Sequence, residues 1–173
     1  GGYHGMCSEA QMSLAPSKLS NFPQAVPDSA GIPESVKSEV LVAPFNDISF
    51  IENILAEESS EIAGIIVEPL QRLIPPIKNF LPTLRKLCTK YNILLIFDEV
   101  VTGYRFSYGG AQEYYGVTPD ICTLGKIIGG GFPLAAIAGK KEIMDHFDKE
   151  KVGSDGFLMQ IGTLSGNPIA SVA

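Results

Sequence analysis

From residue 40 onward, apolar residues at helical spacing alternate with short apolar runs typical of strands. Ile48, Ile51 and Leu55 recur at helical spacing behind Asn46 or Asp47, either of which can cap a helix. A second helix is predicted near residues 80–91, with basic residues on one side; its apolar side consists of Phe80, Leu84, Leu87, Cys88 and Tyr91. Pro82 falls in the first turn of that helix, where its missing N–H costs little.

Short apolar runs between the helices predict strands at residues 40–42, 62–67, 93–97, 121–124 and 134–138. The run 93–97 does not alternate with polar residues, which is typical of a strand buried on both faces. Strands and helices follow one another with short connections. The sequence therefore predicts an α/β fold with a mainly parallel sheet.

Residues 11–39 show neither helical spacing nor an apolar run typical of a strand. They contain four prolines among serine, asparagine and glycine, namely Pro16, Pro23, Pro27 and Pro33. This composition breaks regular structure, so we expect a long excursion over the surface. A loop of this length in a compact domain is usually functional or disordered.

Length and charge limit the classes of function. The 173 residues suffice for one domain with a core, and 45% of them are hydrophobic. A net charge of -6 argues against a surface for nucleic acid or for anionic membranes. No apolar run approaches the roughly 20 residues that span a bilayer. The three cysteines form no CxxC pair and have no metal-ligand spacing with the two histidines, so we expect no metal. A reducing compartment, cytosolic or organellar, is expected, and the cytoplasm is the simpler of the two.

Acidic or basic residues follow the ends of three of the predicted strands. Glu68 follows 62–67, Asp98 and Glu99 follow 93–97, and Lys126 follows 121–124. Ligands of parallel sheets bind beyond the carboxyl ends of the strands, where the loops converge. Each residue alone could be a solvated loop charge, but three successive strand ends favour a site.

Asp98 and Lys126 are the strongest candidates for chemistry. Asp98 ends an apolar strand, where an ionised carboxylate needs a cationic partner; a capping or hairpin role is the alternative. Lys126 precedes three consecutive glycines, 129–131, which are retained where the backbone turns sharply or approaches a ligand. An apolar pocket between strand ends would lower the pKa of a nucleophilic lysine.

Other nucleotide and nucleophile motifs fail on spacing. A Walker loop would need a hydroxyl residue where Ile127 stands. The glycines beginning at Gly129 place Leu134 where a dinucleotide motif needs its third glycine. The segment 162–166 has the order GxxSG, not that of a nucleophile elbow. A nucleotide-binding α/β domain is therefore disfavoured.

Three segments together resemble class III pyridoxal-phosphate (PLP) aminotransferases. They are Asp98-Glu99-Val100-Val101-Thr102-Gly103, Lys126 with its glycine triplet, and Gly162-Thr163-Leu164-Ser165-Gly166-Asn167-Pro168. The chain is similar to the glutamate-1-semialdehyde aminomutase subgroup through residues 102–105 and 108–112. The resemblance covers essentially the whole chain, from Tyr3-His4-Gly5 onward, and implies the large domain of fold type I, a three-layer α/β sandwich.

The resemblance also implies a role for each site residue. Lys126 would be the Schiff-base lysine and would shuttle the proton between substrate Cα and cofactor C4′. Asp98 would pair with the pyridine nitrogen. Val100 and Tyr3 would lie against the two faces of the ring. Thr163 would bind the phosphate of the cofactor in a partner subunit, which implies a homodimer, and Glu68 would support the site.

Two departures keep the reaction open. Val101 stands where many members have a glutamine that can meet the cofactor's phenolic oxygen. Glu68-Pro69 is followed by Leu70-Gln71-Arg72, not by the Gly-Asn stretch of aminomutases. We therefore expect an aminotransferase that exchanges an amino group between an amine or amino acid and a keto acid or aldehyde. The alternatives are the aminomutase, an isomerase, and a noncatalytic fragment.

We expect residues 1–173 to form a single, incomplete PLP-binding large domain. The phosphate loop and the small domain of the family would lie outside it, together with the arginines that bind substrate carboxylates. Arg72 and Arg105 are candidates for this role within the chain, but a surface ion pair is the expectation for each. The isolated piece is expected to be inactive.

Overall fold

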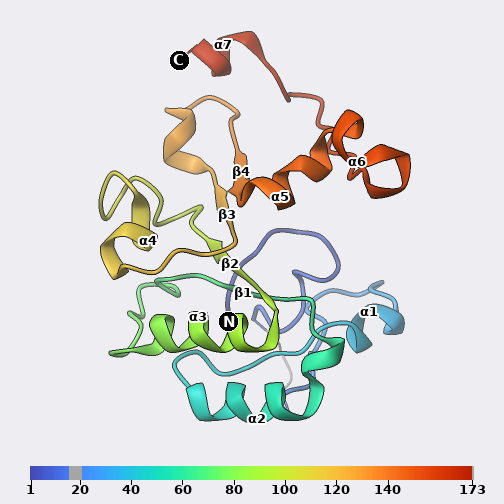
Figure 1. Cartoon of the computed structure of the whole chain (residues 1–173), viewed down its shortest axis with the longest axis vertical. Coiled ribbons are helices and arrows are strands. Elements are labelled where there is room, and N and C mark those ends of the chain that lie inside the picture. The colour runs from blue at the N-terminus through green and yellow to red at the C-terminus, as the bar shows by residue number, and fades with distance from the viewer. Residues whose placement is uncertain (16–20, 173) are drawn as a thin grey trace.

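A four-stranded sheet forms the centre of the computed structural model, which describes residues 1–15 and 21–172. The strand order is β1 (Gly64–Val67), β2 (Leu94–Asp98), β3 (Ile121–Leu124) and β4 (Ala136–Gly139). β1, β2 and β3 pair in parallel, and β4 runs antiparallel to β3 (Figure 1). The predicted α/β fold with a mainly parallel sheet is confirmed.

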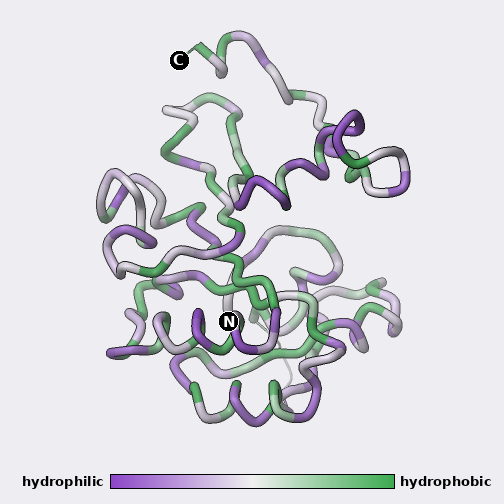
Figure 2. The backbone as a smooth tube through the Cα atoms, in the orientation of Figure 1, coloured by the Kyte–Doolittle hydropathy of each residue, from purple (hydrophilic) through white to green (hydrophobic). Residues whose placement is uncertain are grey.

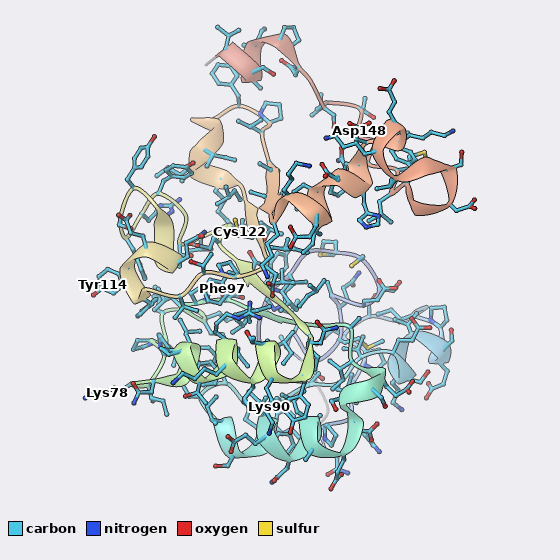
Figure 3. All side chains as sticks on the ribbon, viewed as in Figure 1. Lys78, Lys90, Phe97, Tyr114, Cys122 and Asp148 are labelled. Carbon is cyan, nitrogen blue, oxygen red and sulfur yellow. The ribbon has the colours of Figure 1, made fainter. Side chains whose placement is uncertain are left out.

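Two amphipathic helices, α2 (Ile48–Glu58) and α3 (Phe80–Tyr91), cover one face of the sheet. Asp47 caps α2, because its Oδ1 accepts a hydrogen bond from the Phe50 N–H at 2.9 Å. Phe97 of β2 is fully buried in the same apolar cluster as the side chains of α3 and lies deep in the molecule, whereas Lys78 and Tyr114 lie at its periphery (Figure 3). The apolar stretches of the chain gather at the sheet (Figure 2).

The remaining elements are short. They include α1 (Glu34–Ser38), which lies within the excursion, and η1 (Ser59–Glu61), α4 (Gly110–Tyr115) and η2 (Lys126–Gly129). The chain continues through α5 (Lys141–Met144), η3 (Asp145–Phe147), α6 (Lys149–Gly156) and α7 (Pro168–Val172). This last group lies at the end of the molecule away from α2 and α3 (Figure 1).

The predicted strand at residues 40–42 is wrong. Leu41 forms only an isolated bridge with Gln24. The Val42 N–H donates to the Pro23 carbonyl at 2.8 Å, and a proline has no N–H with which to return a bond and extend the ladder. The predicted excursion 11–39 is otherwise irregular apart from α1 and a bridge between Met12 and Pro27; its residues 16–20 lie outside the described part.

The boundaries of three predicted strands also shift. β2 covers Leu94–Asp98, not 93–97. β1 begins at Gly64, not at Ile62, because residues 59–61 form the turn η1 and the Ile62 N–H bonds back to Ser59. β4 covers Ala136–Gly139, not 134–138, and is the antiparallel edge.

The prediction that β2 is buried on both faces is wrong. Leu95 and Phe97, which face the helices, are fully buried, whereas Leu94 on the opposite face is 37% exposed. Asp98 has the parity of Leu94 along the strand, so its side chain lies on the sheet face away from α2 and α3. The polar end of β2 therefore points into a different environment from its apolar core.

Asp120, just before β3, joins three elements through one buried carboxylate. Its Oδ2 accepts from the Leu95 N–H at 2.7 Å and from Arg85 of α3 at 2.6 Å, and its Oδ1 accepts from Lys140 at 2.6 Å. Burial raises the pKa of Asp120, but the bonds from Leu95, Lys140 and Arg85 outweigh it and bring the pKa down to about 2. The folded state therefore favours the ionised form.

We expect Asp120→Asn to lower the free energy of unfolding by about 1–3 kcal/mol at neutral pH, because the charge-assisted bonds to Arg85 and Lys140 are lost. The folded pKa lies below the ordinary value of 3.8, so this stabilisation is present above that pH and disappears as pH falls toward 2. Urea unfolding at pH 7 and pH 3 measures it. Asp145→Asn, at an exposed lysine pair, is the control. Equal stability of Asp120→Asn and parent at pH 7 would contradict the assignment.

Candidate active site

A cavity of about 490 Å³ opens at the carboxyl ends of β1, β2 and β3. Four of the five residues predicted for the site line it, namely Tyr3, Asp98, Val100 and Lys126. Glu68, Arg72 and Thr123 line it as well, together with His4, Gly5, Ile66, Leu70, Leu73, Val101 and Thr102. Residues more than a hundred positions apart in the sequence thus share one concave surface.

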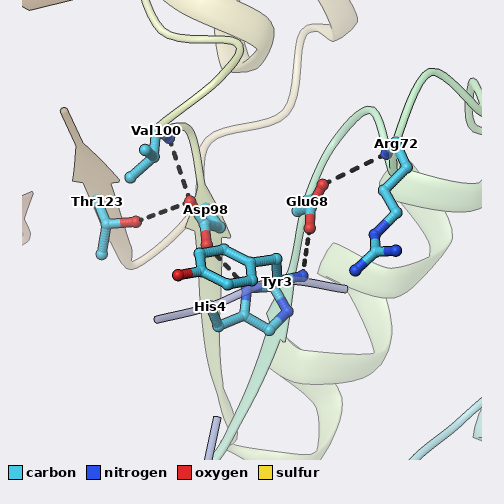
Figure 4. A network of polar contacts seen from close by, with 7 residues as sticks. All are labelled: Tyr3, His4, Glu68, Arg72, Asp98, Val100 and Thr123. Atoms are coloured by element: carbon cyan, nitrogen blue, oxygen red, sulfur yellow. Dashed lines mark hydrogen bonds and ion pairs between the residues drawn. The ribbon is translucent and has the colours of Figure 1, made fainter. Parts of the chain in front are cut away.

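Asp98 ends β2 and is 7% exposed. Its Oδ2 lies 2.8 Å from Nδ1 of His4, and its Oδ1 accepts from the Val100 N–H at 3.1 Å and from the Thr123 hydroxyl at 3.2 Å (Figure 4). Burial raises the pKa of Asp98, but these hydrogen bonds and the charge of His4 outweigh it, so the pKa lies below its usual value. Asp98 is therefore a carboxylate at neutral pH.

His4 is the site residue that the sequence did not reveal. No local pattern links the amino-terminal segment to β2, so the sequence does not predict this contact. An ionised carboxylate can only accept, so Nδ1 of His4 must carry the proton of the 2.8 Å bond. His4 thereby fixes the orientation of Asp98, and its place beside Tyr3 in the Tyr-His-Gly motif was the available signal.

Lys126 begins η2, directly after Gly125 and the end of β3. Its φ is 50°, a left-handed conformation that costs an L residue roughly 1–2 kcal/mol. Such strain persists where the surrounding structure enforces it, and it gathers at functional sites. The glycines that follow end the turn, since Gly130 and Gly131 have φ of 55° and 101°. This confirms the sharp turn predicted for the triplet.

Glu68, at the end of β1, holds the amino-terminal segment over the cavity. Its Oε1 accepts from the Tyr3 N–H at 2.5 Å and its Oε2 from the Arg72 N–H at 3.4 Å (Figure 4). Both bonds go to backbone groups, so Glu68 positions other residues around the cavity. Its expected supporting role toward the cofactor stays a prediction.

Glu99, the neighbour of Asp98, is 1% exposed and serves a different purpose. Its carboxylate accepts from the Ala111 N–H at 2.6 Å, the Thr102 hydroxyl at 3.0 Å and the Gln112 side chain at 3.0 Å. A Cβ at Gly110 would stand 2.5 Å from Glu99 Oε2, so only glycine allows this approach. Glu99 anchors the loop before α4 and, unlike Asp98, does not line the cavity.

Thr163 does not join this group. It lines a separate cavity of about 630 Å³ between the segments 133–135 and 162–171, and Asp98 and Lys126 do not line that cavity.

Arg72 and Arg105 do not form the surface ion pairs expected of them. Neither forms an ion pair with any residue of the described part, and Arg72 lies at the first cavity.

The residues of the first cavity fit PLP in their chemistry. An ionised, buried Asp98 suits a protonated ring nitrogen, and an amine on Lys126 suits an aldehyde. Val100 supplies an apolar surface for one face of a flat ring, and a Cβ on the adjacent Gly125 would lie 3.4 Å from it. Tyr3, 46% exposed, supplies an aromatic surface.

None of the described helices has the length and apolar character needed to cross a membrane.

Comparisons with known proteins place this chain in a family. The sequence profile named Aminotransferase class-III matches residues 1–173. The chain is 47% identical, over its full length, to the glutamate-1-semialdehyde 2,1-aminomutase of Desulforamulus reducens, and 53% identical over 86% of its length to that of Thermodesulfovibrio yellowstonii. It spans 39% and 34% of these two relatives.

Solved structures agree. An omega-transaminase from Sphaerobacter thermophilus matches 99% of the chain with a TM-score of 0.88 and 40% identity, and 40% of that protein is covered. A transaminase with PLP bound matches 98% of the chain with a TM-score of 0.83 and 31% identity, and 39% of it is covered. The chain belongs to the class III aminotransferases, a family of PLP enzymes.

Proposed function

We propose that the protein containing this chain relocates an amino group with PLP, and that glutamate-1-semialdehyde 2,1-aminomutase is its leading activity. The observation that carries amino-group chemistry is the shared cavity of ionised Asp98 and strained Lys126. The curated relatives, at 47% and 53% identity, support the aminomutase in particular. This reverses the order expected from the sequence, where a general aminotransferase came first.

Each residue has a physical task in this proposal. Bound PLP supplies an electron sink for the carbanion left when the substrate Cα proton departs. Lys126 would hold the cofactor's aldehyde carbon until the substrate amine replaces it there, and its freed Nζ would then take the Cα proton. Asp98, oriented by His4, keeps a proton on the ring nitrogen. Val100 and Tyr3 hold the ring between them.

Thr163 would serve a second copy of the chain. It lies in a cavity apart from Asp98 and Lys126, which suits a hydroxyl that binds the cofactor phosphate of a partner subunit. We therefore propose a homodimer.

The aminomutase reaction needs no second substrate. The amino group moves from C2 to C1 of glutamate-1-semialdehyde and the carbonyl group passes from C1 to C2. One water is released and one is taken up, so substrate and product are isomers. Transamination is the second candidate, because Leu70-Gln71-Arg72 departs from the aminomutase pattern and the omega-transaminase shares 40% of the residues. There the amino group leaves with a separate carbonyl acceptor.

One assay separates the two activities. The protein expressed from its complete reading frame is loaded with PLP and given glutamate-1-semialdehyde alone, and NMR follows the C1-amino isomer. We expect the isomer to accumulate without any acceptor. Amino transfer from a donor amine to added keto acid, without isomer formation, would establish the transaminase instead. Absence of both conversions, with PLP bound, would overturn the proposal.

A further inference from the structure

The loop between β1 and α3 brings an arginine to the cavity in a costly conformation. Arg72 and Leu73 have φ of 46° and 70°, so two consecutive residues other than glycine are left-handed. Such conformations are rare for residues with a side chain, and they mark places where the surrounding structure fixes the backbone for a purpose. Both residues line the cavity.

Hydrogen bonds on both sides hold this loop in place. Gln71 and Ile74 exchange backbone bonds of 3.1 and 2.8 Å. The Asn46 amide donates to the Pro75 carbonyl at 3.0 Å and accepts from the Ile77 N–H at 2.9 Å. Glu68 accepts from the Arg72 N–H. The position of Arg72 is thus set by its backbone, which leaves its guanidinium available.

The charges around the cavity leave that guanidinium without a partner among the described residues. Asp98 is engaged by His4. The oxygens of Glu68 accept from backbone N–H groups, and no ion pair of the described chain includes Arg72. In Figure 4, Arg72 lies beyond Glu68 as seen from Asp98. A cation thus stands away from the end of the cavity that would hold the ring nitrogen.

We propose that Arg72 binds the carboxylate of the substrate. The inference rests on the proposed function, in which Asp98 and Lys126 are engaged by the cofactor and Arg72 remains for the substrate. A guanidinium meets a carboxylate with two parallel hydrogen bonds, which fixes both distance and orientation. Leu70 and Leu73 line the same cavity and offer apolar surface for a short methylene chain. The substrates are therefore amino or carbonyl compounds that also carry a carboxylate.

Glutarate is a suitable probe, because it carries carboxylates on a short chain and has no amino or carbonyl group to react. Calorimetry measures its binding to the PLP-loaded, full-length protein. We expect Arg72→Gln to weaken glutarate binding roughly 10- to 150-fold, as for the loss of a charged hydrogen-bond pair. Arg72→Lys should recover part of the affinity, because the charge remains and the two-pronged geometry is lost. Glutaramide, the uncharged analogue, should not distinguish the variants.

Arg105→Gln is the matched control, because Arg105 is exposed and does not line the cavity. Its glutarate affinity should equal that of the parent. Glutarate affinity in Arg72→Gln within twofold of the parent, or no glutarate binding by the parent, would overturn the inference even if the enzyme isomerises or transfers amino groups. A loss confined to Arg72→Gln in a protein without either activity would uphold Arg72 and refute the proposed function.

Discussion

Replacing Lys126 with alanine is expected to abolish amino-group movement while the chain still folds. The lysine both holds the cofactor and moves the Cα proton, and loss of a positioned proton carrier alone costs about 10²- to 10⁴-fold in rate. Its side chain is exposed at the cavity and forms no hydrogen bond with another described residue, so the fold loses no contact of that kind. Turnover of glutamate-1-semialdehyde, or of a donor and keto acid pair, measures the rate, and thermal unfolding measures the fold.

Borohydride reduction of the PLP-loaded protein tests the same assignment without any turnover. The reduced cofactor should be found by mass spectrometry on the peptide that contains Lys126, and Lys126→Ala should carry no label. Lys141→Ala is the matched control, since Lys141 is an exposed lysine that pairs with Asp145 at the surface. A label on Lys140 or Lys141 in the parent protein would refute the role of Lys126.

Local patterns were enough for the parts of the fold in which neighbours in sequence decide the structure. The apolar run ending at Leu124 is β3 with the predicted limits, and the helical spacing from Ile48 to Leu55 is α2. Both follow from the periodicity of side-chain burial. Asp98 and Lys126 were found for the same reason, because a strand end is a local feature. The structure brings both to one cavity, while their chemical roles stay predictions.

Contacts between distant segments could not be inferred in this way. His4 reaches Asp98 from 94 positions away. The Tyr-His-Gly motif marks His4 as a site residue but does not indicate its partner. Arg72 is expected from the sequence in a surface ion pair, yet it lines the cavity. Its place at the cavity depends on two left-handed residues that no propensity predicts. The strand predicted at 40–42 is wrong for a related reason. A strand needs a neighbouring strand with which to pair, and Leu41 forms only an isolated bridge with Gln24.

Asp98→Asn is expected to retain much of the cofactor but to slow Cα proton removal strongly. Asparagine keeps the size and can still accept from Val100 and Thr123, yet it removes the negative charge that holds a proton on the ring nitrogen. Removing one partner of a buried charge pair costs about 2–5 kcal/mol, or roughly 30- to 4,000-fold in rate. Exchange of the substrate Cα proton with deuterated water, followed by NMR, reports on this step alone.

The pH dependence has a definite sign. The pKa of Asp98 is lowered in the folded protein, so the carboxylate persists from neutral pH down to below its ordinary value of 3.8. In the parent protein, protonation of Asp98 should therefore not slow Cα proton exchange until the pH falls below that value. Loss of the charge by mutation should lower the rate at every pH in this range.

Thr123→Val supplies the graded control. It removes only the 3.2 Å hydrogen bond to Asp98 Oδ1 and leaves the charge and the His4 contact intact. The expected cost is about 0.5–1.5 kcal/mol, or roughly tenfold at most. The two variants should thus separate the charge of Asp98 from its hydrogen bonding. Near-normal exchange in Asp98→Asn would contradict this role and move it to another acid. Glu99 could take the role only if the loop before α4 rearranged, because its carboxylate accepts hydrogen bonds from Ala111 and Thr102.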